Sequence, residues 1–372
     1  MTVQLRPARP APAASRMAVA DCDIHPALRT PNDLDPWLPA RWREHAAQFG
    51  APRRIGMHRG PAYPKSQPDA SRRDAYPPEG GRQGSSPSFL ASHHLDAHNV
   101  TLGILNPLNS GQGVSNPEHS AALCRAVNHW QEEVWLAADD RLRASIVVPY
   151  EYPDLAVREV EHWAGRRGFV QVFLLSRTAE PLGNRRYWPI FEAAAAAGLP
   201  VSVHAFGYGG APIISTGWPS YYIEEMTGHA QSCQAGLSSM LIEGVFERIP
   251  ALRVVMVEAG FAWAPALGWR LDKAWRTLRA ETPHLRQAPS EYMRRHVWWT
   301  TQPMEEPDTR EHLLDTIGWM GWDRLLFATD YPHWDFDDPA YALPLPITEA
   351  QRHQFFMGNA RALYGTEQGM GA

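Results

Sequence analysis

The sequence predicts one α/β domain in which eight strands and their intervening helices close into a (β/α)8 barrel. Eight short apolar runs alternate along the chain with segments of helical periodicity, the order expected for a parallel sheet. Most of these runs are continuously apolar, as in strands buried on both faces. Eight such units favour a closed barrel, and an open doubly wound sheet is the alternative. No GxGxxG pattern follows the first run, which argues against a dinucleotide-binding open sheet.

The predicted strands are short, and most end beside a proline, a glycine or a polar residue. In chain order they are 17–22 (MAVADC), 100–105 (VTLGIL), 144–149 (ASIVVP), 168–175 (GFVQVFLL), 199–203 (LPVSV), 252–257 (LRVVMV), 297–301 (VWWTT) and 324–329 (RLLFAT). Their β-branched and aromatic content is typical of strands.

The helices are predicted from apolar residues at three- and four-residue spacing and from capping residues. In the first, Leu123, Val127 and Trp130 recur at helical spacing after an N-capping Asn116. Gly198 ends another helix as its C-cap. The predicted helices are 116–138, 154–164, 187–197, 231–247, 268–279, 308–317 and 347–363.

The domain boundaries follow from changes in composition. Residues 1–16 are rich in Pro, Ala and Arg and lack an apolar signal core, so they are interpreted as a flexible N-terminal arm. Residues 17–372 are predicted to form the single barrel domain. Within it, 51–92 has no strand or helix period and is crowded with Pro, Gly, Arg and Ser. A loop this long is either a functional lid or a disordered insertion after the first strand.

Composition restricts the class of protein. The chain has 372 residues, 44% of them hydrophobic, and a net charge of -5, which favours neither nucleic acid nor an anionic membrane as a partner. No apolar run approaches the ~20 residues of a membrane span. The three cysteines are scattered and predict no disulfide framework, so a reducing, cytoplasmic location is expected. The expected partner is a small-molecule substrate.

Four side chains that can bind a metal follow predicted strands. Asp23 and His25 are two residues apart and share one side of an extended chain. His204 and Asp330 each follow a later strand. The carboxyl ends of barrel strands meet at one face, where chemistry is placed, and neutral imidazole is a common metal donor. The alternatives are aspartates that cap turns and histidines that face solvent or bond to the core backbone.

Two further residues are candidates for proton transfer. Glu258 follows the strand at 252–257, where burial would raise its pKa and suit it to acid–base work. An ion pair with Arg270 is the alternative. His229 is interpreted either as an acid or base beside the site or as a surface residue. His94 lies one helical turn before His98, and both are predicted to be solvated helix residues.

Four runs resemble the amidohydrolase-related family, in particular its branch that includes aminocarboxymuconate-semialdehyde decarboxylase. They are DIH at the first strand, GLPVSVH, LIEGVFERIPALRVVMVEAGFAW and FATDYPHWD, and the similarity extends from about residue 17 to 364. The resemblance implies a distorted (β/α)8 TIM barrel of the metal-dependent hydrolase type with one divalent metal ion, Zn or Mn. It also implies that Asp23, His25, His204 and Asp330 bind the metal, and it suggests a homodimer.

The sequence departs from the family pattern at two of these positions. Asp23 replaces the first histidine of the family's H-x-H motif, which makes the predicted site richer in oxygen and favours harder ions such as Mn²⁺ beside Zn²⁺. Glu258 stands where the family's decarboxylases have a histidine as acid–base. A glutamate can move protons, but it cannot act as an imidazolium that steers a substrate carboxylate.

The loss of that histidine favours a hydrolase as the leading prediction. A bound metal would lower the pKa of a water molecule, and Asp330 would accept its proton. Glu258 and His229 would orient the substrate or protonate the product. The substrate is predicted to be a small organic, aromatic molecule, with Arg270, Trp263 and Trp299 as its binding residues.

Two other functions compete with this prediction. The first is a non-oxidative decarboxylase (a carboxy-lyase) of an aromatic or unsaturated acid, in which Arg270, Arg177 or an arginine of the lid would hold the carboxylate. The second is a barrel retained as a binding module without catalysis. Release of CO₂ without incorporation of water would favour the decarboxylase, and absence of bound metal would favour the binding module.

Overall fold

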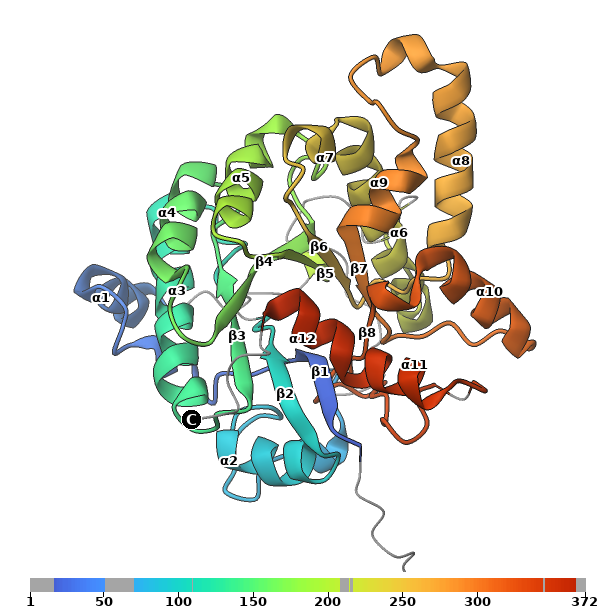
Figure 1. Cartoon of the computed structure of the whole chain (residues 1–372). Helices are drawn as coiled ribbons and strands as arrows, with labels where there is room; N and C mark the ends of the chain where they lie inside the picture. The colour runs from blue at the N-terminus through green and yellow to red at the C-terminus, as the bar shows by residue number, and fades with distance from the viewer. Residues whose placement is uncertain are drawn as a thin grey trace, which may run out of the picture.

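Eight parallel strands form a barrel with helices around it (Figure 1). The computed structural model describes residues 17–50, 70–108, 110–207, 214, 217–343 and 345–365. The predicted arm at 1–16 and the first part of the predicted lid, 51–69, lie outside these residues. The strands are β1 (Val19–Ile24), β2 (Val100–Leu105), β3 (Leu142–Val147), β4 (Phe169–Arg177), β5 (Val201–Gly207), β6 (Val254–Val257), β7 (Val297–Thr300) and β8 (Leu325–Leu326).

Each strand pairs with the next one along the chain, in the order β1 to β8. The segment after β8 closes the barrel onto β1. The amide of Cys22 donates to the carbonyl of Phe327 at 2.9 Å, and the amide of Asp330 donates to the carbonyl of Asp23 at 3.1 Å. The prediction of a (β/α)8 barrel is therefore confirmed, and the open sheet is excluded.

Helices cover the outside of the barrel between successive strands. They are α1 (Ala40–Phe49), α2 (Pro87–Leu90), α3 (Pro117–Trp130), α4 (Pro153–Trp163), α5 (Trp188–Ala196), α6 (Tyr222–Ile242), α7 (Val245–Arg248), α8 (Ala264–Thr277), α9 (Pro289–His296), α10 (Arg310–Met320), α11 (Glu349–His353) and α12 (Asn359–Tyr364). Short 3-10 or π-helical segments join them: η1 (Pro31–Leu34), η3 (Arg73–Ala75), η4 (Ala91–Asp96), η5 (Gln131–Leu136), η6 (Arg185–Tyr187), η7 (Arg279–Glu281), η8 (Trp322–Arg324) and η9 (Gln354–Gly358).

The longest helix starts earlier than its apolar pattern predicts. The sequence places this helix at 231–247, but α6 begins at Tyr222, where the amides of Ser220 and Tyr221 donate to the Glu224 carboxylate and cap its first turn. The aromatic and polar residues of the first turns hide the helical period. As a result, His229 lies within the helix and not at its start.

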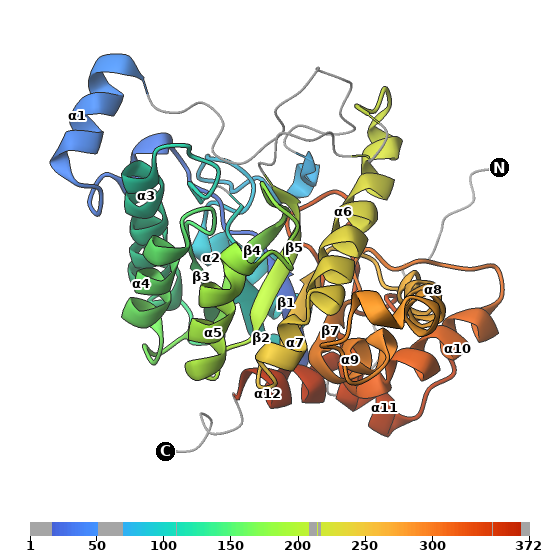
Figure 2. The ribbon, with the colours of Figure 1, turned by 90° about the horizontal axis from the view of Figure 1, so that it is seen from above.

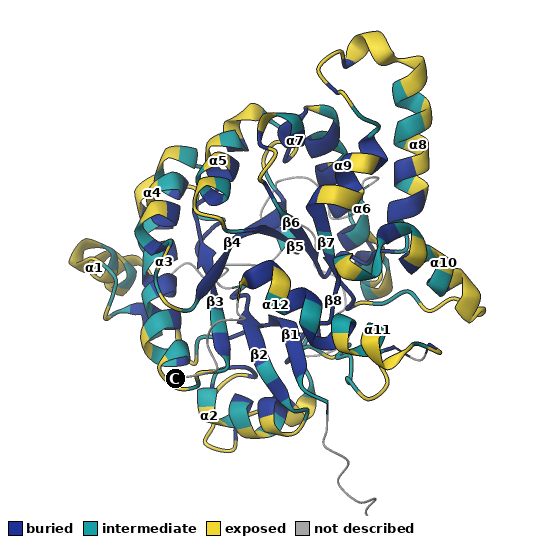
Figure 3. Cartoon of the chain, in the orientation of Figure 1, coloured by how far each residue is buried: buried dark blue, intermediate teal, exposed yellow. Residues whose placement is uncertain are grey.

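The strands are buried, and the exposed residues gather on the outer faces of the helices (Figure 3). Helix α1 has no buried residue, and α8 buries only Ala264, Pro265 and Gly268 near its start. Both helices project from the barrel in Figure 1. Among the described residues, no helix combines the length and the apolar composition needed to cross a bilayer.

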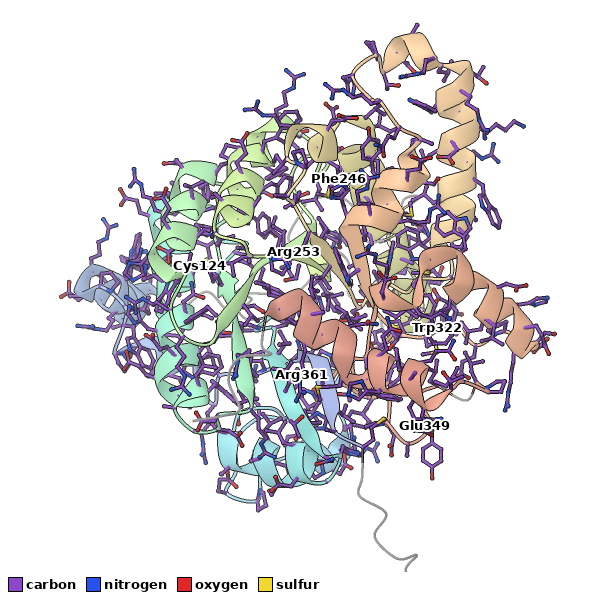
Figure 4. All side chains as sticks on the ribbon, in the orientation of Figure 1. Cys124, Phe246, Arg253, Trp322, Glu349 and Arg361 are labelled. Atoms are coloured by element: carbon purple, nitrogen blue, oxygen red, sulfur yellow. The ribbon has the colours of Figure 1, made fainter. Side chains whose placement is uncertain are left out.

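The last helix closes one end of the barrel (Figure 2). Residues of α12 and η9 pack with Cys22, Ile104 and Val257 in one apolar cluster inside the strands. Arg253, just before β6, donates to the carbonyl of Leu363 at 2.7 Å, and Asn359 donates to the carbonyl of Trp322 at 2.6 Å. Arg253 and Trp322 are labelled in Figure 4. These contacts lie at the amino ends of the strands, so the carboxyl ends remain for the site.

The described part of the predicted lid, 70–92, packs against the loops that follow β1 and β8. The amide of Ala27 donates to the carbonyl of Gly84 at 2.8 Å, and the amide of Arg72 donates to the carbonyl of Pro332 at 2.8 Å. Ser71 pairs with His333 in a short antiparallel bridge. This part of the segment is therefore in contact with the carboxyl end of the barrel. Its action as a lid stays a prediction.

Gly84 is expected to be needed for this packing. It has φ +70°, and a Cβ atom there would lie 2.6 Å from the carbonyl oxygen of His25. Gly165 is a matched control, because it has φ +79° and a Cβ atom there would meet nothing within 4 Å. Chemical denaturation should show that Gly84→Ala lowers the free energy of unfolding by ~1–3 kcal/mol more than Gly165→Ala. Equal losses would contradict this role.

Candidate metal centre and active-site cavity

Five metal-compatible side chains converge at the carboxyl ends of four strands. Asp23 and His25 come from the end of β1, His204 from β5, Glu258 from the residue after β6, and Asp330 from the segment after β8; all are buried. The His25 Nε2 atom lies 2.7 Å from Asp330 Oδ1 and 3.3 Å from Asp23 Oδ1. The His204 Nε2 atom lies 3.1 Å from Glu258 Oε2 and 3.5 Å from Asp23 Oδ2. We call these five residues the donor cluster.

The donor cluster fits a cation, because its central atoms have no hydrogen-bond partner. These buried atoms are Asp23 Oδ2, His25 Nε2, His204 Nε2, Glu258 Oε2 and Asp330 Oδ2. All of the five residues except Asp330 offer ligand atoms that lie within 4.8 Å of one another. The ligand atoms of a second group, His25, Glu258, Asp330 and His333, also lie within 4.8 Å of one another. Buried polar groups are nearly always satisfied, so a group of orphaned donors and acceptors at one point indicates a site for a metal ion.

Both imidazoles are held with Nε2 directed into the cluster. The Nδ1 atom of His25 contacts the carbonyl of Asn106 at 2.8 Å, and Nδ1 of His204 contacts the carbonyl of Ala205 at 2.5 Å. A carbonyl can only accept, so the Nδ1 atoms carry the hydrogens. A cation that replaced the proton at Nε2 would meet a lone pair there, the usual arrangement of metal-binding histidines.

Backbone strain is concentrated at the strand ends that present the donors. Glu258 has φ 52°, Asp330 has φ 63°, and Phe206, two residues after His204, has φ 83°. Few residues other than glycine adopt positive φ, and such strain is often found at functional sites. The backbone at Glu258 and Asp330 is therefore held by the fold in a conformation that these residue types disfavour.

The electrostatics of the cluster favour added positive charge. Burial opposes the charge on Asp23, but His25 and His204 outweigh it and hold the pKa of the Asp23 carboxyl well below its usual range. Burial also opposes the charge on His204, yet Asp23 and Glu258 raise the pKa of its imidazole to about 10. Burial raises the pKa of Asp330 to about 6, and burial with the charge of Asp330 raises the pKa of Glu258. Three carboxyl groups in so small a space thus attract protons or a cation.

Asn106 supports the donor cluster from inside the barrel. Its amide donates to Asp23 Oδ1 at 2.8 Å, and its carboxamide oxygen accepts from Ser145 Oγ at 2.7 Å and from Gln171 Nε2 at 3.0 Å. Tyr364 of α12 donates to Gln171 Oε1 at 3.0 Å. A buried hydrogen-bonded chain therefore links the final helix to a carboxylate of the donor cluster.

Asn106→Ala is expected to weaken metal binding by about 10- to 100-fold, because partners of metal ligands contribute this much to affinity. Equilibrium dialysis against Mn²⁺ would measure the change. Asn128→Ala is the matched control, since Asn128 is equally buried and bonds to the backbone of Val147 away from the cluster. It should reduce stability and leave metal affinity unchanged. The same loss of affinity in both variants would show that the effect of Asn106 is only structural.

The comparison with protein families agrees with this site. A model of the amidohydrolase family, Amidohydro_2, matches residues 20–366. The chain belongs to the amidohydrolase family. The resemblance inferred from the sequence is therefore confirmed, and so is the prediction that the protein is an enzyme.

Several amidohydrolase relatives are named for decarboxylation. Gamma-resorcylate decarboxylase of Polaromonas sp. strain JS666 is 28% identical over 73% of this chain and 85% of the relative. The enzyme of the same name from Rhodococcus jostii strain RHA1 is 26% identical over the same shares of the two chains. The solved dihydroxybenzoic acid decarboxylase of Polaromonas sp. JS666, with bound manganese and the inhibitor 2-nitroresorcinol, covers 95% of this chain and 98% of its own, with a TM-score of 0.63 and 20% identity.

These relatives overturn the leading functional prediction. The sequence predicts a hydrolase because Glu258 replaces the decarboxylase histidine, but the curated relatives are decarboxylases. The prediction of a hydrolase is therefore wrong. The error comes from treating one acid–base residue as decisive, although a buried carboxyl group can also donate a proton.

A cavity of about 510 Å³ adjoins the donor cluster at Glu258. It lies between the first half of α6, the start of α8 and the loop after β7. Among the five donors, only Glu258 is also part of its lining. The lining residues are Met226, Thr227, His229, Ala230, Gln231, Gln234, Glu258, Ala259, Gly260, Ala262, Trp263, Pro303, Met304 and Glu305. The cavity is large enough for a small organic molecule.

The other predicted site residues take different positions around this cavity. His229 and Trp263 line it. Trp299 is buried behind Trp263, with the two rings at 80° and their centroids 5.0 Å apart. Arg270 is exposed on α8 and is not among the lining residues, and Glu258 pairs with His204 rather than with Arg270. Arg177 is buried at the end of β4.

Three residues near the cluster were missed or misjudged from the sequence. His333 Nδ1 lies 2.6 Å from Asp330 Oδ1, and the ring of His333 stacks on His25. The sequence offers one sign of this contact: His333 follows Asp330 by three residues in the run DYPHWD. The prediction that His94 is solvated is wrong, since it is fully buried and its Nε2 lies 2.7 Å from Asp21 Oδ2. Asp21 was missed because it lies inside β1, between Ala20 and Cys22. The sequence predicts this segment only as a strand of the core.

Proposed function

We propose that the protein is a metal-dependent, non-oxidative decarboxylase of an aromatic carboxylic acid. The single observation that carries the proposal is the position of Glu258, a buried carboxyl that belongs both to the donor cluster and to the cavity lining. A decarboxylase needs a proton donor next to the bound carboxylate, and Glu258 is suited to that position. The names of the curated relatives support the same class of reaction.

The proposed metal ligands are Asp23, His25, His204 and Asp330. We propose manganese in preference to zinc, because a set of two carboxylates and two imidazoles beside Glu258 is rich in oxygen. The solved Polaromonas decarboxylase, which holds manganese, supports this choice. A divalent ion held by these residues would supply positive charge for the carboxylate of the substrate. His333 restrains Asp330, because its Nδ1 atom lies 2.6 Å from the same Oδ1 atom that His25 contacts.

Glu258 is proposed to supply the proton of the reaction. Cleavage of the bond between the ring carbon and the carboxylate leaves the electron pair on the ring carbon and releases CO₂. Protonated Glu258 donates its proton to that carbon, so that the ring gains one hydrogen and Glu258 becomes a carboxylate. Burial raises the pKa of Glu258, which keeps it protonated at higher pH than usual. Water entering the cavity then returns a proton to Glu258.

The test is incubation of the Mn²⁺-loaded protein with hydroxybenzoates, beginning with gamma-resorcylate, in D₂O. The expected result is equimolar CO₂ and phenol, with one deuterium on the carbon that carried the carboxylate. No oxygen from solvent should enter the phenol. Absence of CO₂ with every hydroxybenzoate, from protein that is shown to hold its metal, would contradict the proposal.

A further inference from the structure

The charge of the cavity is unusual for a protein that accepts a carboxylic acid. Two acidic side chains, Glu258 and Glu305, belong to its lining, and the described lining residues include no lysine or arginine. Gln231 and Gln234 of α6 are its amides, and Met226, Met304 and Trp263 form apolar walls that suit a planar ring. No lysine or arginine of the described lining can hold a second carboxylate, and the imidazole of His229 acts on Glu258.

The Glu305 carboxylate is fixed in place by the backbone before α8. Its Oε2 atom accepts from the amides of Phe261 and Ala262, both at 3.1 Å. Its Oε1 atom occupies the space where a side chain at residue 260 would begin, 2.3 Å from an ideal Cβ, and Gly260 has φ +62°. Glycine at this position therefore allows the carboxylate to lie flat against the backbone. Within the described residues Oε1 makes no hydrogen bond, so it remains an acceptor.

Glu258, the other acidic residue of the lining, belongs to the donor cluster. Its Oε2 atom lies 3.1 Å from His204 Nε2, and Glu258 is only 6% exposed. Where Glu258 and the donor cluster receive the reacting carboxylate, Glu305 is left to meet the part of the substrate farther from the metal. An acceptor that is fixed in place favours ligands with a hydrogen-bond donor at that point and disfavours ligands with a negative charge there.

We infer that Glu305 determines specificity by accepting a hydrogen bond from a hydroxyl or amino substituent of the substrate and by excluding a second carboxylate. The inference rests on the proposed function, since it assumes that the scissile carboxylate lies at the donor cluster. The substrate class is therefore an aromatic monocarboxylic acid that carries a hydrogen-bond donor on the side of the ring away from that carboxylate. A substrate with two carboxylates would place a negative charge beside Glu305 with no cation to balance it.

Binding of substituted 2-hydroxybenzoates to the Mn²⁺-loaded full chain tests the inference. The probes are 2-hydroxybenzoates with an amino, hydroxyl, methoxy or carboxylate group at ring position 4 or 5, and titration calorimetry gives their affinities. In the wild type, the better of the two amino or hydroxyl isomers should bind about 10- to 100-fold more tightly than the methoxy or carboxylate compound, the range expected for a hydrogen bond to a charged group. Glu305→Gln should reduce this preference to about threefold or less and improve binding of the carboxylate compound.

Glu306→Gln is the matched control, because Glu306 is the exposed neighbour of Glu305 and is not part of the cavity lining. It should keep the wild-type order of affinities. Equal affinities for donor and carboxylate compounds in the wild type, or an unchanged order in Glu305→Gln, would overturn the inference even if CO₂ is released. The expected order without CO₂ release would support the inference and contradict only the proposed reaction. Binding of none of the probes would contradict both.

Discussion

His204→Ala is expected to reduce the metal content of the purified protein from about one divalent ion per chain to less than about a tenth of that value. The imidazole of His204 contributes one of the two nitrogens of the donor cluster, and its Nε2 atom lies close to both Asp23 and Glu258. Removing it leaves His25 as the single nitrogen donor among three carboxyl groups that repel one another. Elemental analysis after dialysis against Mn²⁺ would measure the change, and CO₂ release should fall with it.

His296→Ala provides the control for this variant. His296 is also buried, and its Nδ1 atom contacts the carbonyl of Leu252 at 2.9 Å, as those of His25 and His204 contact their carbonyls. It is outside the donor cluster. His296→Ala should lower stability but keep its metal. Full metal content in folded His204→Ala would show that the donor cluster is not the metal site.

Glu258→Gln is expected to lower the rate of CO₂ release by about 10²- to 10⁴-fold, the range for loss of a general acid. The amide has nearly the shape of the carboxyl group but no acidic proton, so substrate affinity should stay close to that of the wild type. Glu258→His should recover part of the lost rate, since an imidazolium can also donate a proton from this position. Single-turnover assays would separate the chemical step from binding.

Metal content is the necessary control for both substitutions at Glu258, since its Oε2 atom also faces the donor cluster. Each variant should be assayed at saturating Mn²⁺, and its bound metal should be determined in the same preparation. A rate for Glu258→Gln within about threefold of the wild type, at equal metal content, would contradict the proposed proton transfer. Another group would then supply the proton.

The sequence was sufficient to predict the barrel and much of the site, for a physical reason. Donors that directly follow buried parallel strands are brought to one edge by the sheet itself, so Asp23, His204 and Asp330 could be assigned to a common face before their distances were known. The run VVMVE also identified Glu258, because a carboxylate is unusual directly after four apolar residues. These predictions required only the position at which each strand ends, and not the register in which the strand pairs with its neighbours.

Residues whose role depends on packing could not be predicted in the same way. Asn106 meets Asp23 only because β2 pairs with β1 in one particular register. The burial of His94 depends on η4 lying against β1 and the segment after β8, which no local pattern specifies. Glu305 is close to Gly260 only through the approach of two loops. Tertiary contacts of this kind have no periodic signal in the sequence.

The arrangement of the donors along the chain has a consequence for synthesis of the protein. Asp23 belongs to the first strand and Asp330 follows the last, while Tyr364 of α12 completes the hydrogen-bonded chain to Asp23 through Gln171 and Asn106. A nascent chain on the ribosome therefore lacks one carboxylate of the donor cluster until the segment after β8 has emerged. A chain arrested before α12 would contain all five donors but would leave Gln171 without its tyrosine partner. The donors can therefore come together only late in synthesis, when the last strand of the barrel has been made.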